Sequence, residues 1–302
     1  MEIGFVGLGK MGMNMVERLR RDNHKIFAFD LDAAKLREVS TFGADGVNSL
    51  RDLVGGLTAP RGVWVMVPAG EPTDTTINQL AELLSPGDTI IDGGNTNFHD
   101  DVRRAAELAE KKLHHLDAGT SGGIWGLKDG YCLMIGGENE IYRRYEPIFK
   151  TLAPPDGYDF MGGHGSGHYV KMIHNGIEYG LMQAYAEGFE AMHKSGYGLD
   201  LANIAKLWGR GSVVRSWLLE LTAAALEKDP GLANIKGYVE DSGEGRWAVA
   251  DALDNEVSMP LLAMSLFARF RSRANQGAEG TFGEKLLAAL RSEFGGHAVI
   301  KD

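Results

Sequence analysis

The stretch MEIGFVGLGKMGMNMVERLR, residues 1–20, points to a fold class. Its apolar start predicts a strand over residues 3–6, and a Gly-x-Gly-x-x-Gly motif follows at once. Apolar residues at helical spacing come next, so the motif lies between a strand and a helix, as a dinucleotide-binding turn requires. Such a turn lets the pyrophosphate of a cofactor approach the helix N-terminus. Cofactor contacts are expected from Gly7, Leu8, Gly9, Lys10, Met11 and Gly12.

A second strand is predicted over residues 25–29, and it ends in Asp30, 18 residues after Gly12. A carboxylate at this point accepts hydrogen bonds from the adenosine ribose diol and repels a 2′-phosphate. Leu31 and Asp32 follow, so no arginine is present to receive such a phosphate. The alternative is an aspartate that only caps the next helix. The sequence therefore predicts NAD rather than NADP, with Asp30 and Leu31 among its contacts.

Four more strand-like segments, 62–67, 89–91, 115–117 and 131–135, predict a doubly wound, Rossmann-type α/β sheet. A parallel sheet gathers its ligand loops at the carboxyl ends of its strands. Val67 and Asn95, the latter in Asp-Gly-Gly-Asn, are therefore expected beside the cofactor. The turn Ser121-Gly122-Gly123 could hold an anion through its backbone N–H groups, or it could be an ordinary loop.

Segment 154–167, with Pro-Pro, Gly-Gly and Gly-Ser-Gly, predicts a domain boundary. Beyond it the pattern is helical, over 168–193, 200–208, 213–227, 245–254, 260–274 and 283–293. We expect a dinucleotide-binding Rossmann domain over residues 1–164 and an all-helical domain over residues 165–302 that binds substrate and dimerises.

The first of these helices carries a polar face beside its apolar face. Lys171, His174, Asn175 and Glu178 lie at i, i+3, i+4 and i+7, within an arc of roughly 100°. An amine, an imidazole, an amide and a carboxylate on one face could perform acid–base chemistry. The alternative is a solvated surface with an ion pair.

Charge and composition exclude several classes of protein. The net charge of −10 argues against nucleic acid or an anionic membrane as a partner. No apolar run approaches the length of a membrane span and no signal peptide is visible, so a cytoplasmic location is expected. The single cysteine, Cys132, excludes an internal disulfide, and its apolar surroundings predict a buried structural thiol. The nine histidines show no convincing ligand spacing, so no metal site is expected.

With this acidic balance, an anionic substrate needs a local group of cations. Arg269 and Arg273 lie one turn apart on a predicted helix and could converge on a phosphate, or they could form a solvated basic face. Arg291 and His297 lie near the C-terminus, where a frayed end is the ordinary assumption.

Taken together, these motifs resemble the decarboxylating 6-phosphogluconate dehydrogenases, specifically their short-chain form, over nearly the whole sequence. The Lys-x-x-His-Asn-x-x-Glu helix is the specific part, because related 3-hydroxyacid dehydrogenases share the glycine turn but lack His174 and Glu178. The resemblance rests on Gly7-Leu-Gly9-Lys-Met-Gly12, Ile91-Asp-Gly-Gly-Asn95, Ser121-Gly122-Gly123, Lys171-Met-Ile-His174-Asn175-Gly-Ile-Glu178-Tyr179, Phe267-Ala-Arg269, and Arg291 with His297.

The resemblance implies NAD-dependent, metal-independent oxidative decarboxylation of 6-phosphogluconate to ribulose 5-phosphate, a step of the pentose phosphate pathway. It makes Lys171 the base for the C3 hydroxyl and Glu178 the acid that protonates C1. It places Tyr179 and Arg269 at the phosphate, and Arg291 and His297 in a tail that completes a neighbour's site in a homodimer or homotetramer. Its sugar-acid contacts are Asn95, Ser121, Gly122, Gly123, His174 and Asn175.

One departure from the family's pattern concerns the phosphate. Ser242 stands where the long form carries a phosphate-binding lysine, and Arg246 or Arg273 could compensate. This leaves gluconate open as the substrate. The chain could also be a 3-hydroxyisobutyrate-type 3-hydroxyacid dehydrogenase that does not decarboxylate, or a regulatory module that binds NAD without turnover.

Overall fold

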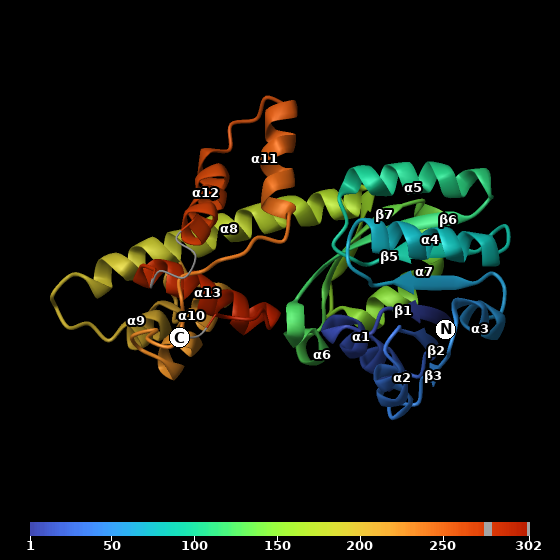
Figure 1. Cartoon of the computed structure of the whole chain (residues 1–302), viewed down its shortest axis with the longest axis horizontal. Coiled ribbons are helices and arrows are strands. Elements are labelled where there is room, and N and C mark those ends of the chain that lie inside the picture. Colours follow the sequence, from blue (N-terminus) through green and yellow to red (C-terminus); the bar gives the residue numbers. More distant parts are fainter. Residues whose placement is uncertain (275–279, 301–302) are drawn as a thin grey trace. The chain divides into compact units, whose positions relative to one another are not determined.

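The computed structural model describes residues 1–274 and 280–300. Contacts divide the chain into two compact units, Met1–Lys171 and Met172–Asp302. Figure 1 follows the chain from the strands and helices of the first unit, in blue and green, to the helices of the second, in yellow to red. The division falls inside helix α8 (Ser166–His193), whereas the boundary after residue 164 stays a prediction.

An eight-stranded sheet forms the first unit, with the order β3-β2-β1-β4-β5-β6-β7-β8. Strands β1 to β6 are parallel, β7 runs antiparallel to β6, and β8 is parallel to β7. The order reverses between β1 and β4, as in a doubly wound sheet, so the predicted fold class is confirmed. The strands are β1 (Glu2–Val6), β2 (Lys25–Phe29), β3 (Asp45–Gly46), β4 (Gly62–Val65), β5 (Thr89–Asp92), β6 (His114–Ser121), β7 (Cys132–Gly137) and β8 (Tyr158–Gly162).

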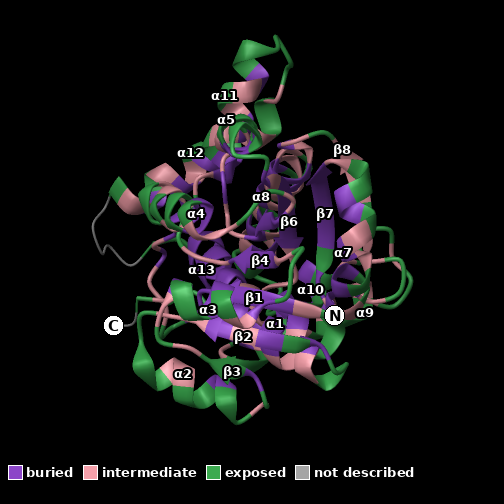
Figure 2. Ribbon diagram, turned by 90° about the vertical axis from the view of Figure 1, so that its right-hand side faces the viewer, coloured by how far each residue is buried: buried purple, intermediate pink, exposed green. Residues whose placement is uncertain are grey.

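Helices cover both faces of this sheet because its strands are apolar on both sides. One core contains residues of α1 (Lys10–Arg21) and α7 (Asn139–Leu152), and Phe5 and Trp64 stack in it with ring centroids 6.2 Å apart. The other contains residues of α3 (Leu50–Gly56), α4 (Glu71–Leu83) and α5 (Phe98–Glu110). Figure 2 shows the central strands as buried. The remaining helices are α2 (Ala33–Ser40), η1 (Gly123–Trp125) and α6 (Gly126–Asp129).

Two features of this unit differ from expectation. Segment 154–167, predicted to be the domain boundary, contains the unpredicted strand β8, which is short and is enclosed by glycines and prolines. Cys132 is exposed instead of buried, because it is the first residue of β7 and precedes the strand's buried stretch. The apolar residues that follow Cys132 therefore indicate a buried strand, but they do not indicate that its thiol is buried.

The second unit is helical in its described part, as predicted. Its core gathers residues of α8, α9, α10 and α13, including Phe189, Leu219 and Leu286. Helix α10 begins later than predicted because Ser216 caps it by accepting a hydrogen bond from the Leu219 N–H. Within residues 1–274 and 280–300, no helix is both long and apolar enough to cross a membrane. The helices after α8 are α9 (Leu201–Trp208), α10 (Trp217–Lys228), α11 (Glu244–Asp254), α12 (Pro260–Ala274) and α13 (Phe282–Gly295).

Candidate functional site

The glycine turn between β1 and α1 has a backbone that side chains would disrupt. Gly7 has a φ of 97°, and a Cβ there would lie 2.3 Å from the carbonyl oxygen of Met66. A Cβ on Gly12 would lie 2.1 Å from the Gly7 carbonyl oxygen, so these two glycines permit close packing of turn and helix. A Cβ on Gly9 would meet nothing within 4 Å. The open side of Gly9 is therefore where a pyrophosphate can approach the backbone.

Asp30, at the end of β2, ties the glycine turn to the second strand. Its carboxylate accepts hydrogen bonds from the backbone N–H of Leu8 at 2.6 Å and of Asp32 at 2.9 Å, and Lys35 pairs with it at 3.4 Å. Burial raises the pKa of Asp30, but these hydrogen bonds and the lysine charge outweigh it and lower the pKa. The carboxylate is therefore ionised at neutral pH, as recognition of a ribose diol requires.

A pocket of about 620 Å³ adjoins this turn. It brings together five residues predicted to bind the cofactor, Gly7, Gly9, Asp30, Leu31 and Val67. Leu8 and Lys10 line a neighbouring pocket with Gly9, while Met11 and Gly12 belong to α1. No motif in the sequence pointed to the opposite wall, which α4 supplies with Glu71, Thr75, Thr76 and Gln79. The size and position of this cleft fit the adenosine half of a dinucleotide.

Lys171, in the second turn of α8, is held near the carboxyl end of β5. Its amine donates a hydrogen bond to the Asn95 side-chain oxygen at 2.5 Å, and the residue is only 8% exposed. A Cβ on Gly119 would lie 2.6 Å from the Lys171 Cβ, so the glycine in β6 makes room for the lysine. Two of the residues predicted to lie beside the substrate, Lys171 and Asn95, are thus in contact.

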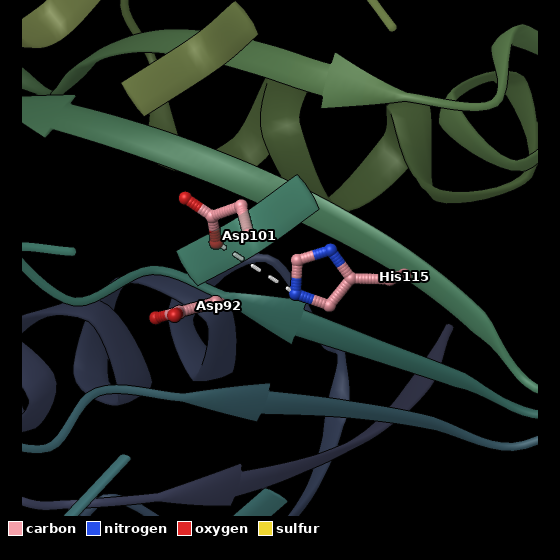
Figure 3. A group of neighbouring side chains, drawn as sticks. All are labelled: Asp92, Asp101 and His115. Carbon is pink, nitrogen blue, oxygen red and sulfur yellow. Dashed lines mark ion pairs between the residues drawn. The ribbon is translucent and has the colours of Figure 1, made fainter. Parts of the chain in front are cut away.

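A cluster of buried titratable side chains lies near the turn that carries Asn95. It contains Asp92 at the end of β5, Asp101 and Arg104 on α5, His115 and Asp117 on β6, and His168 on α8. Each of them is at most 1% exposed. Figure 3 shows Asp101 and His115 facing each other, with Asp92 beside them. The His115 Nε2 lies 3.8 Å from an Asp101 oxygen.

Some of these groups have the residue types of metal ligands, with candidate atoms within 4.8 Å of one another. Asp92, however, accepts hydrogen bonds from the Thr96 hydroxyl at 2.8 Å and from Arg104 at 3.0 Å. Asp117 accepts from the backbone N–H of Gly165 and of His168. Asp92 and Asp117 are thus already engaged by a cation, a hydroxyl and N–H groups, and these contacts compete with binding of a metal ion. The expectation of no metal site stays a prediction.

The Ser121-Gly122-Gly123 turn joins the end of β6 to η1. Gly122 and Gly123 have φ values of 133° and 54°, which favour glycine. Ser121 pairs with Cys132 across the β6–β7 ladder. The positive φ angles explain why glycine occupies both positions. Contact of this turn with a sugar acid stays a prediction.

In the second unit, a carboxylate not anticipated from the sequence contacts the polar face of α8. Asn175 donates a hydrogen bond to Glu244 at 2.6 Å, and the His174 Nδ1 lies 2.9 Å from the Asn175 oxygen. Glu244 is buried at the start of α11, in the Ser-Gly-Glu-Gly-Arg-Trp run. Glu178, one turn beyond Asn175, is half-buried. The face is thus not a solvated surface.

Tyr179 and Arg269, expected at a phosphate, lie against each other. The Arg269 guanidinium lies 3.3 Å from the centroid of the Tyr179 ring, and both residues are buried. Arg269 donates to the carbonyl oxygen of Glu240, and the Tyr179 hydroxyl accepts from the Ser242 N–H. Burial lowers the pKa of Arg269 to about 10, so it stays charged at neutral pH.

The tail residues lie close to the same arginine. Arg291 is buried on α13, and its charge acts to lower the pKa of Arg269. His297 is exposed, yet partial desolvation and the cations Arg291 and Arg269 lower its pKa. Arg269 and Arg291 therefore form one positive region within a single chain, and the neutral His297 lies beside it.

The two arginines proposed to compensate for Ser242 have a different partner. Arg246 pairs with Asp241 at 2.8 Å, and Arg273 pairs with the same carboxylate at 2.9 Å. Asp241 is almost fully buried and fixes both of them. Arg273 therefore does not converge with Arg269 on an anion in this structure, and the compensation stays a prediction.

Comparison with known proteins agrees with this arrangement. Residues 2–163 match the NAD binding domain of 6-phosphogluconate dehydrogenase, and residues 167–298 match its C-terminal domain. The chain belongs to the 6-phosphogluconate dehydrogenase family. A putative 6-phosphogluconate dehydrogenase of Bacillus subtilis is 45% identical over the full length of both chains. An NAD(+)-dependent, decarboxylating family member of Haloferax volcanii is 43% identical, over 100% of this chain and 99% of its own.

Solved structures include a 6-phosphogluconate dehydrogenase and a dehydrogenase of another name that shares the fold. The 6-phosphogluconate dehydrogenase of Plasmodium falciparum superposes with a TM-score of 0.83 at 26% identity, over 97% of this chain and 70% of its own. A 3-hydroxyisobutyrate dehydrogenase of Mycobacterium tuberculosis has a TM-score of 0.75 at 21% identity, over 94% of this chain and 97% of its own. The second likeness shows a shared fold only.

We predict that Asp30→Ala narrows the preference for NAD over NADP. The substitution removes the carboxylate that repels a 2′-phosphate and leaves the Lys35 amine without this partner. The ratio of kcat/KM with NAD to that with NADP should fall at least about tenfold, or about 1.4 kcal/mol. Asp32→Ala, which removes only the cap of α2, is the control. An unchanged ratio in Asp30→Ala would mean that another residue discriminates.

The buried cluster predicts how stability changes with pH. Burial lowers the pKa of His168, but the Asp101 charge overcomes this and raises it from 6.5 to about 9. Between these values the folded chain keeps a proton that the unfolded chain has released, so the free energy of unfolding falls as pH rises.

Urea midpoints at pH 7 and pH 9 measure this fall. Asp101→Asn should make it smaller, because the pKa of His168 then returns toward its ordinary value. Asp100→Asn, at a half-buried neighbour on α5 outside the cluster, should retain the full decrease. Equal falls in all three proteins would contradict the assignment.

Proposed function

We propose that this protein catalyses the NAD-dependent oxidative decarboxylation of 6-phosphogluconate to ribulose 5-phosphate and carbon dioxide. The observation that carries the proposal is the buried Lys171 amine, hydrogen-bonded to Asn95 at the carboxyl end of β5. A surface ion pair needs no such burial, whereas a base acting on a substrate hydroxyl does. NAD as the cofactor follows from Asp30 and from the family.

Lys171 takes the proton of the substrate's C3 hydroxyl, for which its amine must be neutral at that moment. Bound NAD supplies the hydride acceptor. The product is a 3-keto acid, whose bond between C2 and the carboxylate breaks with its electron pair passing into the ketone. The protonated Lys171 then hydrogen-bonds the developing enolate oxygen, which stabilises the charge without a metal ion.

Glu178 has the second role, proton delivery to C1 (the former C2) of the enediol. It lies seven residues after Lys171 on α8, and at this spacing two side chains project from the same face of a helix. It is half-buried, and the role requires its carboxyl to hold a proton at the moment of transfer. His174 and Asn175 hold the hydroxyls of the sugar acid between these two groups.

The positive region around Arg269 favours a phosphorylated substrate over gluconate. Arg269 and Arg291 are both buried, and burial of two neighbouring cations is costly unless an anion binds there. A phosphate contacting Arg269, Tyr179 and the tail residues would compensate both charges.

A homodimer or homotetramer in the cytoplasm completes the proposal. The second unit exposes large apolar side chains, which mark interaction surfaces when they gather on neighbouring turns: Ile177 and Leu181 on α8, and Leu261, Met264 and Phe267 on α12. Completion of a neighbour's site by Arg291 and His297 rests on the resemblance alone, because both already lie near Arg269 of their own chain.

We predict that NADH and carbon dioxide form in a ratio near one from 6-phosphogluconate. The purified protein is assayed with 6-phosphogluconate and with gluconate, each with NAD and with NADP. NADH without carbon dioxide would indicate a 3-hydroxyacid dehydrogenase. Tight NAD binding without NADH from any sugar acid would indicate a regulatory module. Higher kcat/KM with gluconate would overturn the phosphate assignment.

Two variants test the proposed acid–base roles. Lys171→Met should lower kcat by about 10²- to 10⁴-fold with NAD affinity unchanged, because the amine acts on substrate. Glu178→Gln should lower it by roughly 10²-fold. Lys194→Met, at an exposed lysine just beyond α8, is the control. Wild-type turnover in Glu178→Gln would show that its carboxylate only maintains the structure.

A further inference from the structure

His168 holds two parts of the first unit together. Its Nδ1 lies 2.7 Å from an Asp101 oxygen, and its Nε2 lies 3.1 Å from the carbonyl oxygen of Gly94. The side chains of His168 and Asp101 are fully buried. A carbonyl oxygen can only accept a hydrogen bond, so the Nε2 carries a proton and donates it to Gly94.

The Gly94 carbonyl belongs to the turn that presents Asn95. The backbone N–H of Gly94 donates to Asp92 at 3.0 Å, so this glycine is bonded on both sides, to Asp92 and to His168. Asn95 follows directly in the sequence. The imidazole therefore limits the position of the side chain that accepts the hydrogen bond of Lys171.

The same histidine lies on the helix that carries the lysine. Its backbone N–H donates to Asp117 at 3.0 Å, and that of Gly165 donates to the same carboxylate at 2.7 Å, so Asp117 caps the start of α8. Lys171 is three residues after His168, on the adjacent turn and near the same side of the helix. One side chain thus connects the Asn95 turn to the helix of Lys171.

We propose that His168, held by Asp101, is a positioning residue that fixes the Lys171 amine against the Asn95 amide for reaction at the substrate's C3 hydroxyl. The inference rests on the proposed function. His168 does not reach the substrate in this assignment. It acts by limiting movement of two groups that do, and a displacement of about 1 Å can cost 10²-fold in rate.

The charges around the imidazole support a fixed ion pair. Asp101, Asp92 and Asp117 surround His168, and Arg104 is bonded to Asp92. Burial and the two other aspartates raise the pKa of Asp101, while the His168 charge and hydrogen bond, at 2.7 Å, act to lower it and favour the ionised carboxylate. Burial lowers the pKa of neighbouring His115 to about 3, so His115 is neutral and does not compete for Asp101. The positive partner of Asp101 is therefore His168.

His115 gives a matched control. It is as buried as His168 and lies beside the same aspartate, but neither ring nitrogen has a hydrogen-bond partner among the described residues. His168→Phe and His115→Phe thus make the same change of shape in one cluster, while only the first breaks the link between Gly94 and α8. His168→Gln keeps an amide donor and serves as the conservative variant.

The experiment compares these variants with the wild type by steady-state kinetics with 6-phosphogluconate and NAD. We expect His168→Phe to lower kcat by about 10²-fold, with the dissociation constant of NAD changed less than about twofold. The isotope effect on kcat with 3-deuterated 6-phosphogluconate should rise, because hydride transfer becomes slower than product release. The kcat of His168→Gln should fall about tenfold, and the kcat of His115→Phe should fall less than about threefold.

Thermal unfolding of each variant is measured beside the kinetics. Equal kcat values in folded His168→Phe and His115→Phe would overturn the positioning role, as would an isotope effect that does not rise. Should His168→Phe fail to fold, the same comparison is made with His168→Gln. A wild-type kcat in His168→Gln would then also overturn the positioning role. A wild type that does not oxidise 6-phosphogluconate would remove the proposed function itself.

Discussion

The contact between the Lys171 amine and the Asn95 amide oxygen, 2.5 Å long and almost hidden from solvent, sets the requirements for the rest of the first unit. A lysine can come this close to the sheet only because β6 carries Gly119 beneath it. The Asn95 amide keeps its position only because the turn after β5 is fixed. Parallel strands supply both conditions, since their carboxyl ends meet at one edge. The chemistry assigned to α8 therefore depends on packing in the sheet.

Buried charge is used differently in the two units. In the first, carboxylates outnumber cations and are satisfied by N–H groups, a histidine and an arginine, which makes a rigid support. In the second, cations lie close together around Tyr179, and Asp241 neutralises two others nearby. A rigid acidic support suits a residue that must not move. A concentration of positive charge suits an anion that arrives from solution.

The glycine spacing of residues 7–12, Asp30 and the polar face of α8 were readable from the sequence, because each follows a local period that the fold preserves. Strand β8 was missed because five residues between glycine and proline turns carry too little pattern. The His168–Asp101 pair and the Glu244 contact with Asn175 join residues far apart in the chain, and a single sequence contains no sign of such pairings. The prediction that Cys132 is buried was wrong because apolar neighbours indicate a buried strand. The first residue of a strand can lie outside the buried stretch, as Cys132 does.

The position of Cys132 has a practical consequence. As the chain's one cysteine, exposed and opposite Ser121 in the β6–β7 ladder, it is a natural attachment point for a fluorescent or spin label. Partial desolvation raises the pKa of its thiol, so maleimide coupling will be quicker in mildly alkaline buffer. A dye tethered there would report directly on movements of the adjoining glycine turn, with no engineered cysteine needed.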